Sequence, residues 1–423
     1  MSAPEYGWFG DDFTGATDTL AELAARGLRA LLFLGLPDAA RLKRAGPLDA
    51  VGIAGATRTM APDAMAAALR PVGAFFQALG VRLMHYKCCS TFDSAPDVGN
   101  LGAALAALSP CFPHDFRPIL GGQPNLGRFL LFANLFAAAG TGGAVHRIDR
   151  HPTMSRHPVT PMREADLRLH LAAQGVAAAH LAYPALQQDR AALAQVLDHL
   201  LRSAPPAILM DVSREEDLAA IGALLHRQAE RGPLLAIGPS SVAQAWCAGR
   251  ASKPGMAALG PSPGPVLVLA GSLSPVTRVQ VEAASGYHRL TFDPARLVGD
   301  AGASDAVVQD ACRRLDAGQD ILLLTETPGA AALAPGEAAA ATARLLAAVT
   351  RLRPVRRLGI AGGDTSSIGV QALDLWGLSH AGTLAPGVAL CHGHSDDPAL
   401  HGVEIMLKGG QMGPPDLLAR FRL

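Results

Sequence analysis

Short runs of apolar residues recur along this chain, and each is followed by a segment whose apolar residues have a helical period. The runs Tyr6–Gly10, Ala30–Leu34 and Ala50–Ala54 are typical of strands, and the Ala-rich segment Pro62–Leu79 is typical of a helix with proline in its first turn. A strand that is apolar throughout must be covered on both faces, as in parallel sheets built from βαβ units. The sequence therefore predicts an α/β fold of mostly parallel sheets flanked by helices.

A stretch rich in proline and glycine, residues 250–265, interrupts this alternation. The pattern restarts directly after it with the apolar run Val266–Ala270. We therefore expect two α/β domains, residues 1–249 and 266–423, joined by a linker at 250–265. Two such domains create a cleft, which is the usual place for a small-molecule site.

Two regions depart from the pattern. Residues Pro110–Arg163 are rich in Gly, Pro, His and Arg, and we expect irregular structure there around a helix at Leu126–Ala138. The His-rich stretch Ala389–His401 suggests a long loop.

Charge and composition exclude several classes of protein. Lys and Arg number 36, as do Asp and Glu, so the formal net charge is zero and the basic footprint of a nucleic-acid-binding protein is missing. The mean hydropathy is +0.22, yet the longest apolar run, Phe129–Ala139, is about half of the ~20 residues that span a membrane. Asp11 and Asp12 lie where a secretory signal would be apolar. We expect a cytoplasmic enzyme with no nucleic-acid partner and no membrane segment.

The first polar motif, GDDFTGATD at residues 10–18, follows a strand and opens a helix. Small and hydroxyl residues at a helix start leave N–H groups free to meet an anion. Asp11 and Asp12 beside that position suit the binding of hydroxyls, or the acceptance of a proton from one. The alternative interpretation is an aspartate that caps the helix and its acidic neighbour.

Two further polar loops follow strands in the N-terminal half. Arg58 lies just after the run that ends at Ala54, at the edge where open α/β sheets bind ligands, and an arginine there can hold a carboxylate in a bidentate fork. A lone arginine is more often a solvated surface residue, so this signal by itself is weak. The motif KCCSTFDS at residues 87–94 combines a cation, hydroxyls and a carboxylate, a set that suits a polyhydroxylated acid. We interpret Cys88 and Cys89 as small buried side chains rather than as a redox pair.

Three loops rich in glycine and hydroxyl residues follow strands in the C-terminal half. They read AGSLSP from Ala270, AGGDTSS from Ala361 and KGGQMG from Lys408. Glycine lets the backbone approach a phosphate closely, and a following helix directs its positive end toward it. No P-loop motif occurs in the chain, and each loop alone is consistent with a tight turn. The three together predict a nucleotide phosphate site.

Histidines gather in two segments. His392, His394 and His401 offer metal ligands, but the Gly and Ser between them favour a flexible loop, so we predict no metal-binding residues. The basic segment at residues 146–157 suits contact with an anionic substrate, or is a solvated connection.

The motifs GDDFTGATD, KCCSTFDS, HPVTPM, AGGDTSSIGVQAL, APGV and KGGQMG occur here in this order. In this order they resemble the four-carbon acid sugar kinase family, and the resemblance covers nearly the whole chain. It implies an ATP-dependent kinase that phosphorylates the terminal hydroxyl of a small acid sugar. It also implies that the N-terminal domain holds the acid sugar and the C-terminal domain holds ATP; we expect Mg²⁺ to bridge the phosphates. The DDFTGATD and CSTFDS phrases are most similar to the 3-oxo-tetronate kinase branch.

The resemblance also implies roles for individual residues. It implies a sugar-acid contact from Asp12, and we hypothesise that Asp12 is the catalytic residue, which orients the attacking hydroxyl and can deprotonate it. Contacts to the acid sugar are implied for Asp11, Thr14, Arg58, Lys87, Ser90, Thr91 and His157. Contacts to ATP are implied for Ser272, Ser274, Gly362, Gly363, Asp364, Thr365 and Gly410.

The sequence departs from the family pattern in four places. It has GGDTS for GGETS and KGGQMG for KSGNFG, both conservative changes for phosphate binding. The segment GGQPNLGR and the stretch Ala389–His401 differ more, so 3-oxo-isoapionate, D-threonate and D-erythronate stay open as substrates. A non-catalytic sugar-acid sensor and a hydrolase with a metal held by His392, His394 and His401 are alternatives of other classes. A homo-oligomer is also left open.

Overall fold

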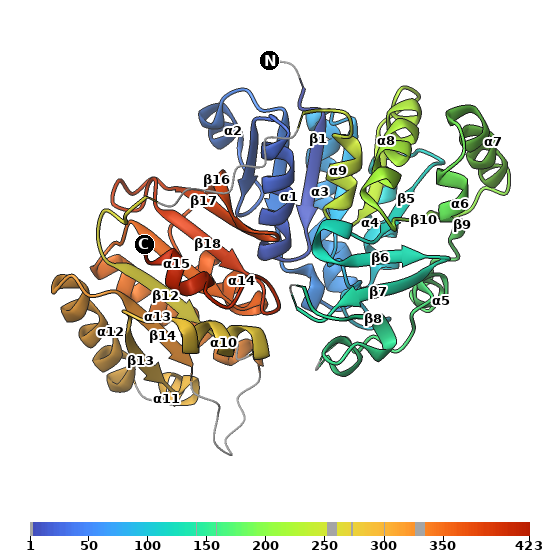
Figure 1. Ribbon diagram of the computed structural model, residues 1–423. Helices are drawn as coiled ribbons and strands as arrows, with labels where there is room; N and C mark the ends of the chain where they lie inside the picture. Colours follow the sequence, from blue (N-terminus) through green and yellow to red (C-terminus); the bar gives the residue numbers. More distant parts are fainter. Residues whose placement is uncertain are drawn as a thin grey trace. The chain divides into compact units, whose positions relative to one another are not determined.

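The computed structural model describes residues 3–140, 142–157, 159–251, 260–271, 274–299, 301–325 and 335–423, without the side chains of residues 301, 335 and 363–366. The chain forms two compact units, residues 1–31 with 35–253 and residues 32–34 with 254–423. In each unit helices flank a mostly parallel sheet (Figure 1), which confirms the predicted α/β class. Residues 252–259 of the expected linker lie outside the described part of the chain.

The first unit is built on a parallel sheet with the strand order β3-β1-β4-β11-β5-β10-β9. Its strands are β1 (Tyr6–Gly10), β3 (Ala50–Ala54), β4 (Leu83–Lys87), β5 (Pro118–Gly121), β9 (Ala179–Leu181), β10 (Ile208–Asp211) and β11 (Leu234–Gly238). Its helices are α1 (Phe13–Ala25), α2 (Ala39–Ala45), α3 (Pro62–Leu79), α4 (Leu101–Leu108), α5 (Leu167–Ala172), α6 (Tyr183–Leu186), α7 (Arg190–Leu201), α8 (Glu215–Ala229) and α9 (Ser241–Trp246).

The centre of this sheet is buried on both faces, as its apolar sequence predicts. Every residue of β1, β3 and β4 is buried. Packing is so close that a Cβ atom at Gly52 would lie 2.2 Å from the ring of the fully buried Trp8. Glycine at this position therefore makes room for the indole on the neighbouring strand.

The predicted helix at Leu126–Ala138 is wrong. This segment forms the antiparallel hairpin β6 (Arg128–Leu131) and β7 (Asn134–Ala138), which β8 (Val145–Arg147) extends into a separate three-stranded sheet. A continuous apolar run does not distinguish a helix from a buried strand by its period. The turn is formed by Phe132 and Ala133, both with positive φ (47° and 64°). Their backbone N–H groups donate to the carboxylate of Asp211, the last residue of β10.

The second unit has the strand order β13-β14-β12-β15-β18-β17-β16. Its first five strands are parallel: β13 (His288–Phe292), β14 (Ile321–Thr325), β12 (Val266–Ala270), β15 (Arg357–Ala361) and β18 (Glu404–Lys408). The antiparallel strands β17 (Val388–His394) and β16 (Gly377–Ala385) follow. The helices are α10 (Pro275–Ala283), α11 (Pro294–Gly299), α12 (Ala301–Asp316), α13 (Pro335–Leu352), α14 (Gly363–Gln371) and α15 (Leu417–Phe421).

The end of one N-terminal strand also belongs to this second unit. Strand β2 (Ala30–Phe33) pairs in antiparallel fashion with β16, Leu32 opposite Leu378 and Phe33 opposite Gly377. The Phe33 ring stacks on Trp376 at a centroid distance of 6.0 Å. The second unit is therefore assembled from two separate parts of the sequence.

The expectation of a loop at Ala389–His401 is wrong for its first half. Strand β17 continues to His394, whose Nε2 lies 2.8 Å from the hydroxyl of Ser379 on β16. The apolar residues Val388–Cys391 are buried and hold this segment in the sheet. In the described part of the chain, no group of three or more His, Cys, Asp or Glu side chains is arranged to hold a metal ion.

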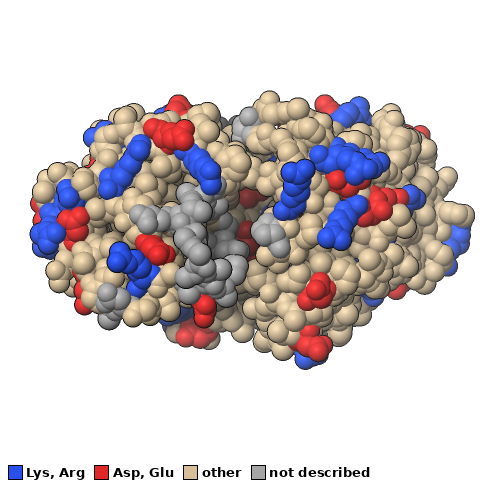
Figure 2. Space-filling model, turned by 90° about the horizontal axis from the view of Figure 1, so that it is seen from below, with Lys and Arg blue, Asp and Glu red and all other residues tan. Residues whose placement is uncertain are grey.

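Basic and acidic side chains are interspersed on the face shown in Figure 2, over the residues that the structure describes. This agrees with the formal net charge of zero. Among the described residues, no helix has both the length and the apolar character needed to cross a bilayer.

Candidate active site

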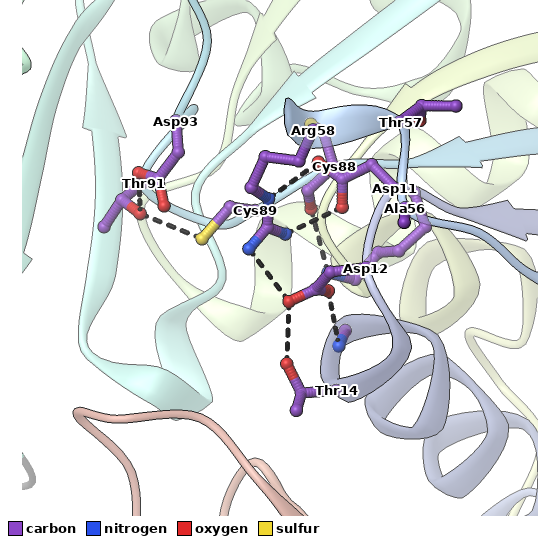
Figure 3. Close-up of polar contacts among 12 residues, drawn as sticks. Asp11, Asp12, Thr14, Ala56, Thr57, Arg58, Cys88, Cys89, Thr91 and Asp93 are labelled. Carbon is purple, nitrogen blue, oxygen red and sulfur yellow. Dashed lines mark hydrogen bonds and ion pairs between the residues drawn. The ribbon is translucent and has the colours of Figure 1, made fainter. Parts of the chain in front are cut away.

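Three polar loops of the first unit meet at one edge of its sheet. Strands β1, β3 and β4 are parallel neighbours, and their last residues Gly10, Ala54 and Lys87 are in register. The chain that follows each strand therefore emerges at the same carboxyl edge, where open α/β sheets bind ligands. Figure 3 shows the side chains that gather there.

Arg58 joins the two acidic residues of the first motif. Its Nε and Nη2 donate to the Asp11 carboxylate at 3.1 and 2.7 Å, and its Nη1 donates to Asp12 at 2.8 Å (Figure 3). The Asp11 and Asp12 side chains are 3% and 11% exposed. Three of the five guanidinium N–H groups thus bind protein carboxylates and fix their orientation.

Asp12 is both a helix cap and a member of this cluster. Its Oδ1 accepts from the backbone N–H of Gly15 and its Oδ2 from the hydroxyl of Thr14, both at 2.7 Å. Burial by itself would raise the pKa of Asp12, but the charges of Arg58 and Lys87 and these two hydrogen bonds outweigh it and hold the pKa below its usual value. Asp12 is therefore an ionised carboxylate, suited to accept a hydrogen bond.

Lys87 places a buried positive charge beside Asp12. The residue is 3% exposed, and its Nζ donates to the carbonyl of Cys88 at 2.8 Å. Among the residues that the structure describes, no carboxylate lies within ion-pair distance of this ammonium group. An ammonium group has three donors, so Lys87 keeps hydrogen-bonding capacity for a ligand.

The loop after Lys87 contributes hydroxyl groups rather than a reactive thiol. The Thr91 hydroxyl donates to Asp93 at 2.6 Å and lies 2.9 Å from the Cys89 sulfur (Figure 3), while Ser90 is half-buried. Burial raises the pKa of Cys89 to about 11 and that of the Cys88 thiol well above its usual value. Both cysteines are therefore protonated at neutral pH and act through packing.

His157 makes its described hydrogen bonds within its own loop. Its Nδ1 accepts from the backbone N–H of Thr160 at 3.1 Å. In the described part of the first unit, no hydrogen bond or ion pair joins it to Asp11, Asp12 or Arg58. Pro158, the next residue of its motif, lies outside the described residues.

The glycine-rich loops of the second unit also converge on one point. Gly362 has a φ of 124°, and its N–H donates to the carbonyl of Lys408 at 2.8 Å. The Ser274 hydroxyl donates to the carbonyl of Gly410. Helix α14 begins at Gly363, directly after β15, so its N-terminus lies at the carboxyl edge of the sheet. Ser272 and the side chains of Asp364 and Thr365 lie outside the described part.

Two residues of this second cluster were given no role from the sequence: Lys408, which opens the KGGQMG motif, and Thr277. Lys408 is fully buried, and its Nζ donates to the Thr277 hydroxyl at 3.0 Å. A signal was available, because β4 and β18 share a feature: each is an apolar strand whose last residue is lysine and whose next residues form a polar loop.

The two units thus define a class of α/β protein, in which one unit offers neighbouring carboxylates beside a buried lysine and the other offers glycine-rich loops. A family model for a sugar-binding N-terminal domain matches residues 6–246. A second model, for a nucleotide-binding C-terminal domain, matches residues 267–418. The chain belongs to the four-carbon acid sugar kinase family, which confirms the resemblance found in its motifs.

Curated relatives match over almost the full length. A 3-oxo-isoapionate kinase of Paraburkholderia graminis is 37% identical, with 98% of this chain and 93% of the relative covered. A 3-oxo-tetronate kinase of Methylobacterium radiotolerans is 32% identical over 98% of this chain and 97% of the relative. Another 3-oxo-tetronate kinase, from Cupriavidus necator, is 31% identical over 98% and 95%.

Solved structures share the fold. A protein from Salmonella typhimurium LT2 superposes with a TM-score of 0.76 at 25% identity, covering 98% of both chains. A Haemophilus influenzae protein of the DUF1537 family gives a TM-score of 0.71 at 24% identity, again over 98% of both chains.

Proposed function

We propose that this protein transfers the γ-phosphoryl group of ATP to the terminal hydroxyl of a small 3-oxo sugar acid, either a four-carbon acid or its branched relative. The names of its relatives and its family membership support a phosphotransferase that acts on a sugar acid. The observation that carries the proposal is that a buried cation, Lys87, and an ionised carboxylate, Asp12, lie near each other on either side of Gly15 at the carboxyl edge of one sheet.

Lys87 and Asp12 together suit the binding of an acid sugar. The ammonium group of Lys87 can bind the substrate carboxylate or keto oxygen, while Asp12 accepts a hydrogen bond from the attacking hydroxyl. Arg58 holds the Asp12 carboxylate in place for this contact. The remaining proposed substrate contacts are Asp11, Thr14, Arg58, Ser90, Thr91 and His157.

Phosphoryl transfer chiefly requires that the attacking hydroxyl is aligned with the γ-phosphorus and that the negative charge of the phosphates is neutralised. The substrate hydroxyl oxygen forms a bond to the γ-phosphorus while the bond from that phosphorus to the β–γ bridging oxygen breaks, and ADP leaves. The hydroxyl proton passes to Asp12 and then to solvent. Because the pKa of Asp12 is held low, we assign it first to orienting the hydroxyl and only late in the reaction to accepting the proton.

We assign the nucleotide to the second unit. Glycine-rich backbone and a helix start are typical of phosphate sites, and the residues proposed to bind ATP are Ser272, Ser274, Gly362, Gly363, Asp364, Thr365 and Gly410. ATP supplies the phosphoryl group, and Mg²⁺ would neutralise charge on its phosphates. Residues 1–249 and 266–423 are our proposed functional domains, one for each substrate.

Two sugar acids are the main candidate substrates. The motifs favour 3-oxo-tetronate, whereas the higher identity to a 3-oxo-isoapionate kinase, 37% against 32%, favours the branched acid. The test is an ADP-release assay of the purified protein with ATP–Mg²⁺ and each acid, with D-threonate and D-erythronate alongside. We expect turnover on one of the 3-oxo acids. Tight binding of such an acid with no ADP release would contradict a kinase and indicate a sensor.

A further inference from the structure

The last residue of strand β18 in the second unit, Lys408, is a fully buried lysine. Lys408 is 0% exposed, and its Nζ donates to the Thr277 hydroxyl at 3.0 Å and to the carbonyl of Gly409 at 2.8 Å, with Gly410 carbonyl at 3.5 Å. All of these acceptors are neutral. Among the residues that the structure describes, no carboxylate lies within ion-pair distance of the ammonium group. A buried lysine whose described partners are all neutral is costly, so its position needs an explanation.

The loop after Lys408 is held by its carbonyl groups. The Gly410 carbonyl also accepts from the hydroxyls of Ser274 and Thr277 on the first turn of α10. One turn further along this helix, the fully buried Gln280 donates through Nε2 to the carbonyls of residues 412, 413 and 414, at 3.1, 3.1 and 2.9 Å. The carbonyl oxygens of this loop therefore point toward α10 and Lys408.

This arrangement determines where the N–H groups point. In a trans peptide the carbonyl of one residue and the N–H of the next lie in one plane and point in opposite directions. With the carbonyls of Gly409 and Gly410 turned inward, the N–H groups of Gly410 and Gln411 point away from the lysine. Both residues are only half-buried, and no hydrogen bond within the described structure uses either N–H group. Successive free N–H groups form a concavity that binds anions.

We propose that Lys408 is a positioning residue for the nucleotide: it draws the Gly409 and Gly410 carbonyls inward and so presents the N–H groups of Gly410 and Gln411 to the phosphates. This inference rests on the proposed function and names a residue that acts through the backbone. Burial lowers the pKa of Lys408 to about 7, so an anion bound at this loop favours the charged ammonium form.

The test compares two buried lysines, one in each unit. Calorimetric titration of Lys408→Met with ADP–Mg²⁺, and separately with the sugar acid that the enzyme turns over, should show nucleotide affinity about 10- to 100-fold weaker, because hydrogen bonds from a charged donor are lost. The KM for ATP rises accordingly, while affinity for the sugar acid is unchanged. The matched variant Lys87→Met should lose sugar-acid affinity and keep nucleotide affinity.

The possible outcomes distinguish a failure of the proposed function from a failure of the role assigned to Lys408. If wild-type protein binds no nucleotide, the proposed function fails. If wild-type protein binds ADP–Mg²⁺ and Lys408→Met binds it within about twofold, only the role of Lys408 is overturned. If Lys408→Met does not fold, Thr277→Val removes one acceptor of the lysine and one donor to Gly410 without removing the charge. It should weaken nucleotide binding about three- to tenfold with no effect on the sugar acid, and unchanged affinity would overturn the inference.

Discussion

Arg58 shows that the contacts of one side chain determine how a sequence motif functions. As an isolated residue in the sequence it suggests a direct contact to a substrate carboxylate, whereas in the structure its guanidinium group binds Asp11 and Asp12. Two of its five N–H groups are left over by the two aspartates, and Lys87 adds a second cation, whose Nζ has a single described partner, the carbonyl of Cys88. At this scale the site is a set of mutually oriented charges, and substitutions should act on orientation more than on folding.

Asp12→Asn is the most direct test of orientation. The amide keeps the shape but loses the negative charge and half of the acceptors, so we expect kcat to fall by about 10²- to 10⁴-fold. Steady-state kinetics measure this, and nucleotide affinity, which belongs to the other unit in our proposal, should be unchanged. Near-native turnover of the variant would remove Asp12 from the reaction.

Gly15→Ala tests how closely the cluster is packed. A Cβ atom there would lie 2.5 Å from Asp12 Oδ1 and 3.0 Å from Lys87 Nζ, so both groups must shift. We expect kcat/KM for the sugar acid to fall at least tenfold, because catalytic groups must be held closely in place. Gly299→Ala, in another helix with open space around the new methyl group, is the control and should leave the kinetics unchanged.

At the scale of elements, local sequence determines the regular parts, and distant residues determine the irregular ones. Strands β1 and β3 and helix α3 begin and end where the sequence predicts, because the period and the capping signals are local. The hairpin β6–β7, in contrast, lies where the sequence predicts a helix. Its turn depends on Asp211 at the end of β10, which accepts from the N–H groups of Phe132 and Ala133 at 2.7 and 3.0 Å.

Asp211→Asn should therefore destabilise the first unit. The carboxylate is fully buried and accepts a third backbone N–H, from Tyr183 at 3.0 Å, and lies 2.9 Å from His180 Nε2. An asparagine has one acceptor oxygen and sets an NH₂ group against these donors, so we expect the free energy of unfolding to fall by about 2–4 kcal/mol in urea titrations. Asp198→Asn, a half-exposed partner of Arg227, is the control. Equal effects of both substitutions would contradict this role of Asp211.

At the scale of the whole molecule, stability should depend on pH through a buried histidine. His85 on β4 is fully buried; Tyr6 Oη on β1 lies 2.8 Å from its Nδ1, and its Nε2 is 2.9 Å from the carbonyl of Gly238 on β11. Burial lowers the pKa of His85 from 6.5 to about 3. The neutral ring therefore links three central strands, with Nε2–H as the donor to Gly238.

The sign of the effect follows from this lowered pKa. The unfolded chain binds a proton at His85 from about pH 6.5 downward, and the folded chain only near pH 3, so the stabilisation is complete above pH 6.5 and is lost as the pH falls toward 3. The expected loss is on the order of a few kcal/mol. Urea titrations from pH 7 to pH 4 should show a steeper loss for wild-type protein than for His85→Gln, and identical slopes would exclude His85 as the cause.

The sequence by itself determined the fold class, most strand positions and the loops that carry polar side chains, because hydrophobic period and glycine-rich motifs act over a few residues. It also determined the family, since the motifs occur in a family-specific order along the whole chain. Only the tertiary structure decided that Arg58 binds two aspartates, that residues 126–138 form a hairpin, and that Lys408 faces the carbonyls of its own loop. These contacts depend on which strands become neighbours and in what register. Residues that form hydrogen bonds in this way are far apart in the sequence, so no periodic sequence pattern predicts them.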